Sequence, residues 1–113
     1  MSVISGAVTV APNAISSNVL AGDVFEFAPP DGAVVNFLAT QAVIGLTVDI
    51  LVGGAAEALG AVPPIRASDA PFPVKPDDSI VIVGAAGGAR LFMRFRNTTG
   101  APIIAQFLIE IAT

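Results

Sequence analysis

Glycine and proline divide this chain into short apolar segments. Its 113 residues include eleven glycines and nine prolines, and the stretches between them are rich in valine, isoleucine and phenylalanine. Such segments, separated by turn residues, are typical of an all-β sandwich or barrel. We therefore predict strands at Ala7–Val10, Asp23–Ala28, Val34–Thr40, Leu46–Val52, Ile65–Ser68, Ser79–Val83, Arg90–Arg96 and Ile103–Ile111.

The predicted fold is all-β, an antiparallel β-sandwich of about eight strands with a jelly-roll-like arrangement. A chain of this length has room for one hydrophobic core. We assign residues 1–22 to an extended N-terminal arm with the first strand, and residues 23–113 to a single sandwich domain. The segment Gly54–Gly60 has a helical composition, but it is too short for more than one or two turns.

Period-two alternation assigns the faces of some strands and leaves others undecided. In the last strand, the odd positions from Ile103 to Ile111 form a continuous apolar face. The segment Ile80–Val83 is apolar on both faces. We expect the core to contain ten side chains: Phe25, Phe27, Phe37, Val48, Ile50, Ile82, Met93, Phe95, Phe107 and Ile109. So small a chain cannot bury both faces of several strands by itself, so a partner chain is expected to cover the rest.

The composition excludes much of the usual chemistry of proteins. Histidine, cysteine, tryptophan and tyrosine are absent, 54% of the residues are hydrophobic, and only 12% are charged. No side chain titrates near neutral pH without perturbation, and no thiolate is available. We therefore expect neither an enzyme nor a bound cofactor. The net charge of −4, with five basic residues, also argues against direct contact with nucleic acid.

The high mean hydropathy of +0.82 has two explanations, membrane insertion or obligate assembly. Polar residues interrupt the most apolar stretch, Ala33–Val62, so that it contains no uncharged apolar window of the roughly 18 residues that a spanning helix needs. Membrane insertion is therefore not expected. An assembly whose subunits cover much of each other's surface is the favoured explanation.

Asp77 and Asp78 form the one pattern that suggests a metal. Adjacent carboxylates bind hard cations such as Ca²⁺, although a complete site needs more oxygen ligands. The alternative interpretation is a turn in which both side chains cap backbone amides. We expect no metal site here, and these two residues are weak calcium candidates.

Arginines recur on one face of the predicted strand at Arg90–Arg96. Arg90, Phe92, Arg94 and Arg96 share this face. If the last two strands form a hairpin, cross-strand pairing places Arg94 near Gln106 and Arg90 near Glu110. This face is then either a solvated outer surface or a row of salt bridges to a neighbouring subunit.

Two loops, at residues 53–64 and 70–78, are long and either apolar or rich in proline. Loops of this kind are candidates for contacts with other proteins. The interface residues predicted from the loops, the strand that follows the first loop and the arginine row are Leu59, Val62, Ile65, Phe72, Arg90, Arg94 and Arg96.

Three parts of the chain carry a family resemblance: the segment Val74–Val83, the long terminal pair of strands Arg90–Ile111, and the extended segment Ser2–Leu20. Together they resemble the small single-jelly-roll or β-sandwich structural proteins of virus particles, namely minor capsid, cement and decoration subunits. The resemblance implies a virion protein that forms a trimer or pentamer and packs against other capsid proteins. Because the chain has no basic terminal arm, it implies a position in the outer shell or at a vertex.

Other functions are compatible with the same sequence. A fibre, pilus or surface-layer subunit of non-viral origin would share this composition and would assemble into open filaments. A small β-barrel that holds an apolar ligand would instead be a monomer. The oligomeric state separates these alternatives.

Overall fold

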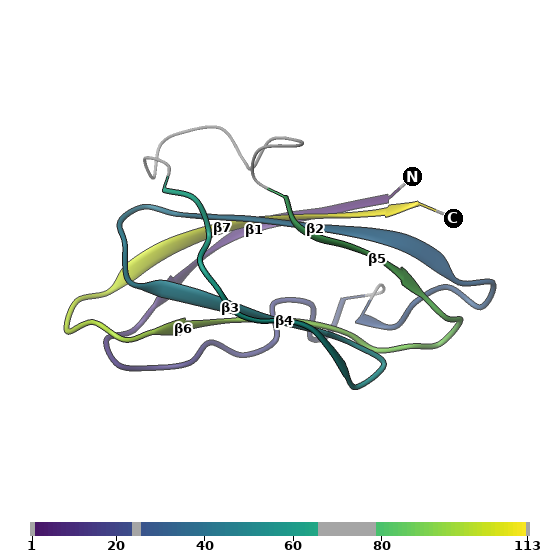
Figure 1. Ribbon diagram of the computed structural model, residues 1–113, viewed down its shortest axis with the longest axis horizontal. Helices are drawn as coiled ribbons and strands as arrows, with labels where there is room; N and C mark the ends of the chain where they lie inside the picture. The colour runs from purple at the N-terminus through teal and green to yellow at the C-terminus, as the bar shows by residue number, and fades with distance from the viewer. Residues whose placement is uncertain (1, 24–25, 66–78, 113) are drawn as a thin grey trace.

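A computed structural model describes residues 2–23, 26–65 and 79–112, and within these residues the chain is all-β without an α-helix. Seven strands form two antiparallel sheets (Figure 1). The strands are β1 (Ser2–Val10), β2 (Ala33–Gln41), β3 (Leu46–Val52), β4 (Ala55–Ala61), β5 (Ser79–Ala85), β6 (Leu91–Asn97) and β7 (Ile103–Ala112).

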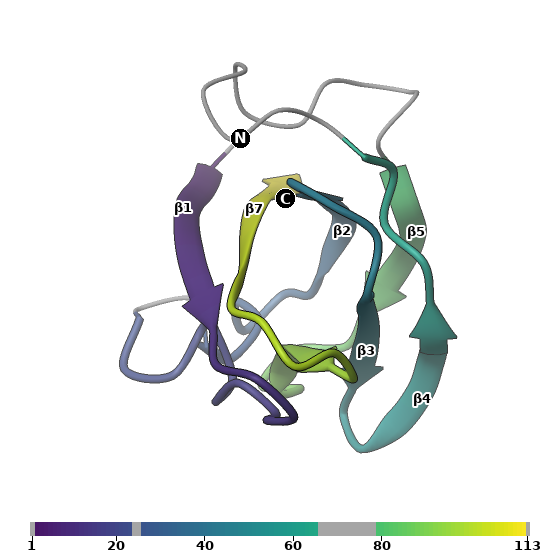
Figure 2. The same cartoon turned by 90° about the vertical axis from the view of Figure 1, so that its left-hand side faces the viewer.

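The two sheets lie as two layers with the hydrophobic core between them (Figures 1 and 2). The four-stranded sheet has the order β1-β7-β2-β5, and the three-stranded sheet has the order β4-β3-β6. One buried cluster joins side chains of both sheets, such as Phe37 and Ile109 from the first and Ile50 and Phe95 from the second. Alternation on β7 is as predicted, since its odd positions from Ile103 to Ile111 are buried.

Most of the predicted core is confirmed. Phe37, Val48, Ile50, Met93, Phe95, Phe107 and Ile109 are buried. Two predictions are wrong, because Phe27 and Ile82 are 54% and 62% exposed. Ile82 lies opposite Asn36 on the outer face, and its neighbours Val81 and Val83 pack against the core instead. Alternation could not decide this strand, because it is apolar on both faces. Phe25 lies outside the described residues.

The structure differs from the strand predictions at several places, and the first is β1, which begins at Ser2 and not at Ala7. The segment at residues 55–61 forms strand β4, because Gly53 and Gly54 both have positive φ and make a tight turn after β3. Two successive residues with positive φ are the geometry of the two-residue turn that joins antiparallel strands. By contrast, the described part of Asp23–Ala28 forms no continuous strand, and Phe27 makes an isolated bridge to Arg90. Ile65 makes another isolated bridge, and Arg66–Ser68 lie outside the described residues.

The predicted terminal hairpin is also wrong. β6 pairs with β3, whereas β7 pairs with β1 and β2 in the other sheet. The chain between β6 and β7 therefore crosses from one layer to the other. The buried amide of Asn97 fixes this crossing, donating to the carbonyls of Val10 at 3.1 Å and Ala101 at 2.7 Å.

An irregular stretch of chain covers the outer edge of β6. We call it the edge segment and define it as residues 14–23 and 26–28. Four backbone hydrogen bonds join it to residues 89–97: Asn97 N to Ala14 O (2.8 Å), Ser16 N to Phe95 O (2.8 Å), Val19 N to Met93 O (2.9 Å) and Ala28 N to Ala89 O (2.8 Å). Side chains supply the remaining bonds, since Ser16 Oγ accepts from Phe95 N, and Asn18 bonds to Leu91 and Met93. The segment thus provides hydrogen-bond partners for the backbone groups on the edge of β6 without forming a regular strand.

Candidate interaction surfaces

The arginine row lies on the outer face of the three-stranded sheet. Arg90, Phe92 and Arg94 line a shallow groove of about 250 Å³ together with Leu51 and Gly54. Each of the two arginines lies 5.6 Å from the centre of the Phe92 ring, one on either side of it along β6. The ring thereby holds both guanidinium groups through cation–π contacts.

Arg94 has a carboxylate partner within the chain. Its Nε lies 3.0 Å from Asp49 Oδ2, and the two residues are direct neighbours across β3 and β6. The other oxygen of Asp49 accepts a hydrogen bond from the Gly60 amide at 3.0 Å. Burial raises the pKa of Asp49, but the Gly60 amide and the charges of Arg94 and Arg96 outweigh it, so that this pKa lies below its ordinary value. The carboxylate therefore stays ionised and ties β3, β4 and β6 together.

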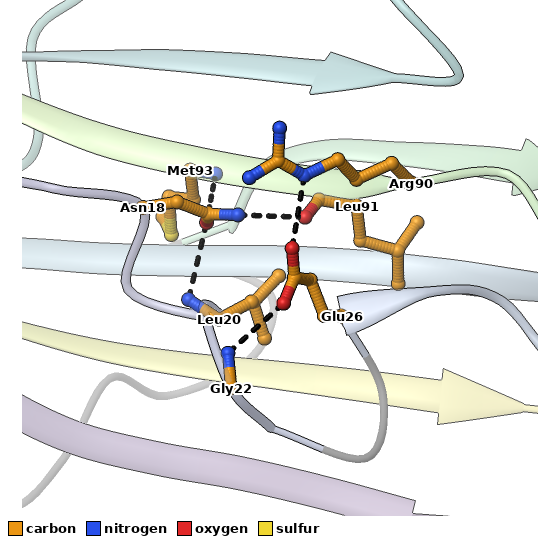
Figure 3. A network of polar contacts seen from close by, with 7 residues as sticks. All are labelled: Asn18, Leu20, Gly22, Glu26, Arg90, Leu91 and Met93. Carbon is orange, nitrogen blue, oxygen red and sulfur yellow. Dashed lines mark hydrogen bonds and ion pairs between the residues drawn. The ribbon is translucent and has the colours of Figure 1, made fainter.

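Arg90 pairs with Glu26 of the edge segment (Figure 3). The Arg90 Nε donates to Glu26 Oε2 at 3.0 Å, and the Gly22 amide donates to Glu26 Oε1 at 2.9 Å. The Gly22 hydrogen bond lowers the pKa of Glu26, desolvation opposes it, and Arg90 lowers it further. Glu26 consequently anchors the end of the edge segment to β6.

The arginine partners differ from those predicted. Arg94 contacts Asp49 and not Gln106, and Arg90 contacts Glu26 and not Glu110, because β6 and β7 belong to different sheets. The sequence could not identify Glu26 or Asp49 as the arginine partners, since each lies more than forty residues away from its arginine. Arg96 is exposed on the same face. A contact between this row and a neighbouring subunit stays a prediction.

The predicted apolar interface residues that are described are exposed, and Ile65 lies beside the end of β2, where it bridges to Gln41. Leu59 on β4 is 66% exposed, and Val62 and Ile65 just beyond that strand are 59% and 56% exposed. Sequence reasoning missed Val43 and Ile44 in the β2–β3 turn, which are exposed to a similar degree. Phe72 lies outside the described residues, as do the calcium candidates Asp77 and Asp78.

Gln41 joins the end of β2 to the start of β3 and to the chain after β4. It is 1% exposed, and its side chain donates to the Pro63 carbonyl and accepts from the Leu46 amide, both at 2.8 Å. Its backbone amide donates to Pro64, and Ile65 bridges to it in parallel. The chain after β4 is therefore held beside the β2–β3 turn. We define the apolar patch as the exposed aliphatic residues of the β2–β3 turn, of β4 and of the chain after β4: Val43, Ile44, Leu59, Val62 and Ile65.

The described part of the chain contains neither a cluster of metal-binding side chains nor a membrane-spanning helix. Residues 2–23, 26–65 and 79–112 contain no group of three or more acidic, histidine or cysteine side chains that could hold a metal ion. Within the same residues, no helix is long and apolar enough to span a bilayer. The glycosylation-like sequence Asn97-Thr98-Thr99 has its asparagine buried, with the amide nitrogen donating two hydrogen bonds. That asparagine therefore has a structural role.

Comparison with protein-family models, with curated proteins and with solved structures finds no match to this chain. The function must therefore be argued from the topology and the surface alone.

Proposed function

We propose that this chain is a structural subunit of a virus particle, a capsid, cement, decoration or vertex protein, which acts by self-assembly and by packing against other capsid proteins. Its site of action is then the outer shell or a vertex of the virion. Two kinds of observation support the proposal: the order of the strands and the chemistry of the exposed surface.

Strand order supports a jelly-roll fold. If the edge segment, which hydrogen-bonds along β6, is counted as the second of eight strands, the two sheets have the orders 1-8-3-6 and 5-4-7-2. That is the order of a jelly roll, an architecture that viral capsid domains share with lectins and cupins. The fold alone does not assign a function, so the surface has to discriminate between these classes.

The apolar patch is the observation that carries the assembly proposal. Five large aliphatic residues, each more than half exposed, lie in the β2–β3 turn, on β4 and in the chain after β4, which Gln41 holds beside that turn. Single exposed aliphatic residues are ordinary, but several on neighbouring segments of so small a domain are typical of a protein–protein interface. Clamping by Gln41 holds the loop backbone in place, so little conformational entropy is lost when a partner covers it.

We propose a closed ring as the assembly. One patch meeting a different surface of the next subunit closes around a rotation axis, as in a trimer or pentamer. The same heterologous contact without closure would give a filament, which is the behaviour of a non-viral fibre or pilus subunit.

The native mass tests the proposal. We would measure it by light scattering with refractive-index detection, because a chain without tryptophan or tyrosine absorbs little at 280 nm. A discrete oligomer that resists dilution supports the virion subunit, and negative-stain images should show closed rings. Open filaments would favour the fibre subunit. A monomer at all concentrations would overturn self-assembly.

Leu59→Asp tests whether the apolar patch forms the contact. Because Leu59 is exposed on an edge strand, we expect this variant to keep the wild-type circular dichroism spectrum and to lose the oligomer. The matched control is Ala86→Asp, which adds the same charge at an exposed position in the turn after β5. Wild-type assembly by Leu59→Asp, or equal loss in both variants, would contradict this role of the patch.

A further inference from the structure

Among the residues that the structure describes, nothing pairs with the outer edge of β1, and the strand itself lacks the features that usually protect a sheet edge. It is one of the two terminal strands of the four-stranded sheet, the other being β5, and its pairing with β7 runs in one unbroken register from Ser2 to Val10. Between described residues, no backbone hydrogen bond links Ser2–Thr9 to anything except β7. In an antiparallel strand, alternate residues direct both backbone groups to the same side, so about half of these groups point away from the sheet.

Comparison with β4 shows how unusual this edge is. β4 ends the other sheet, and its pairing with β3 is interrupted by two register shifts. It also carries the exposed charge of Glu57. Bulges and charges of this kind prevent edge strands from pairing with other chains. β1 has no charge, no proline and no register shift, and the chain has no charged side chain before Asp23.

A groove of about 320 Å³ lies beside the open edge, lined by Ala7 and Val8 of β1 and by Asn18 and Val19 of the edge segment. The ring of Phe107 forms part of this groove and lies directly against Gly6, where an added Cβ would come within 2.9 Å of the ring. A strand placed beside β1 would therefore find free hydrogen-bonding groups and, next to them, a groove of mixed polar and apolar lining.

We propose that two copies of this chain pair through β1, antiparallel and about a twofold axis at Gly6. The proposal rests on the self-assembly proposed above and names a second contact for it. A twofold axis at Gly6 pairs the strand residue by residue, from Val3 opposite the partner's Thr9 to Thr9 opposite the partner's Val3. The two four-stranded sheets then become one continuous sheet of eight strands.

The sequence of β1 is complementary to itself in this register. Positions that face the core meet each other, with Ile4 opposite the partner's Val8 and Gly6 opposite the partner's Gly6. Positions on the outer face also meet, with Val3 opposite the partner's Thr9 and Ser5 opposite the partner's Ala7. No pair brings like charges together, and β-branched pairs of this kind stabilise antiparallel strands. The Phe107 rings of both copies lie beneath the paired glycines, where an aromatic ring compensates for the missing side chains.

Paired charges at two outer positions test the register. Ser5 and Ala7 are exposed on the outer face and lie opposite each other across the proposed axis. Ser5→Lys combined with Ala7→Lys would place two like-charged pairs in the interface. Ser5→Lys combined with Ala7→Glu would place two opposite-charged pairs at the same positions. We expect the first variant to have at most half the native mass of the wild type, and the second to keep the wild-type mass.

The outcomes separate this inference from the proposed function. An unchanged mass in the double-lysine variant would exclude the β1 contact and leave assembly through the apolar patch intact. Loss of mass in both double variants would refute the register, since complementary charges should preserve it. A monomeric wild-type chain would overturn both proposals.

A disulfide provides a second test, because the chain has no cysteine of its own. Ser5→Cys combined with Ala7→Cys should give a covalent dimer on mild oxidation, since directly opposite Cβ atoms in a strand pair are close enough to bridge. Val34→Cys is the matched control, an exposed outer-face position on β2 away from the proposed axis. Equal dimer yields from both variants would contradict the β1 pairing.

Discussion

The Asn18 side chain supplies hydrogen bonds to the edge of β6 that a neighbouring strand would otherwise supply. Removing that side chain should destabilise the whole fold. Asn18 is 7% exposed and makes three hydrogen bonds to backbone groups (Figure 3). Its Oδ1 accepts from the amides of Leu20 and Met93, both at 3.1 Å, and its Nδ2 donates to the Leu91 carbonyl at 3.2 Å. Asn18→Ala would leave all three backbone groups without these partners.

The magnitude follows from those three groups. A buried polar group that loses its partner costs about 1–3 kcal/mol. Because Asn18 lies beside the groove at β1, water reaches part of the vacated space, so we take the lower end for each group. The expected loss is therefore about 3 kcal/mol, a large part of the roughly 5–15 kcal/mol that stabilises a typical domain. For a domain of this size, this loss lowers the melting temperature by about 12 °C.

Thermal unfolding followed by circular dichroism would measure this loss, with Ser17→Ala as the matched control. Ser17 is the exposed neighbour of Asn18, so we expect its substitution to change stability by less than about 0.5 kcal/mol. All variants must be compared at one protein concentration, because assembly stabilises the folded state. If Asn18→Ala melted within about 4 °C of Ser17→Ala, the edge of β6 would not depend on this side chain.

Two further predictions concern the acidic and glycine residues of the fold. Because the folded state lowers the pKa of Asp49, its ion pair with Arg94 contributes stability above pH of about 4, and this contribution is lost as the pH falls through the folded-state pKa. Asp49→Asn should therefore lower the melting temperature at neutral pH, with the difference from wild type shrinking in acid; a constant difference would contradict the assignment. Gly87→Ala should cost about 2 kcal/mol, because the new Cβ would overlap the Pro30 carbonyl oxygen, whereas Gly84→Ala points into open space. Equal denaturant midpoints for the two glycine variants would refute the steric argument.

Sequence patterns were most informative where the signal was local. Turn residues and β-branched segments predicted an all-β chain, and alternation on β7 predicted its buried face correctly. Gly53-Gly54 is a turn as predicted, but strand β4 after it is not predicted, because its alanines are typical of a short helix. Two glycines with positive φ decide the conformation more strongly than the weak helical preference of a short segment.

The interaction surfaces could be predicted only in part. Three exposed residues of the apolar patch, Leu59, Val62 and Ile65, were proposed from composition, because apolar loops are visible in a sequence. Val43 and Ile44 were missed, since nothing local indicates that Gln41 holds their turn beside the chain after β4. The alternating arginines of β6 were also visible, but their partners were not.

What the sequence by itself determined is the class of structure: β-strands, their approximate limits, and the faces of those strands that alternate in polarity. Only the tertiary structure decided which strands are neighbours, as when β6 and β7 separated into different sheets and the edge segment took the place of a strand beside β6. The reason is physical. Backbone preference and side-chain alternation act between residues close in sequence, whereas sheet pairing is selected by packing and hydrogen bonds between segments tens of residues apart. A strand that is apolar on both faces, such as β5, carries no local information about which face the core will take.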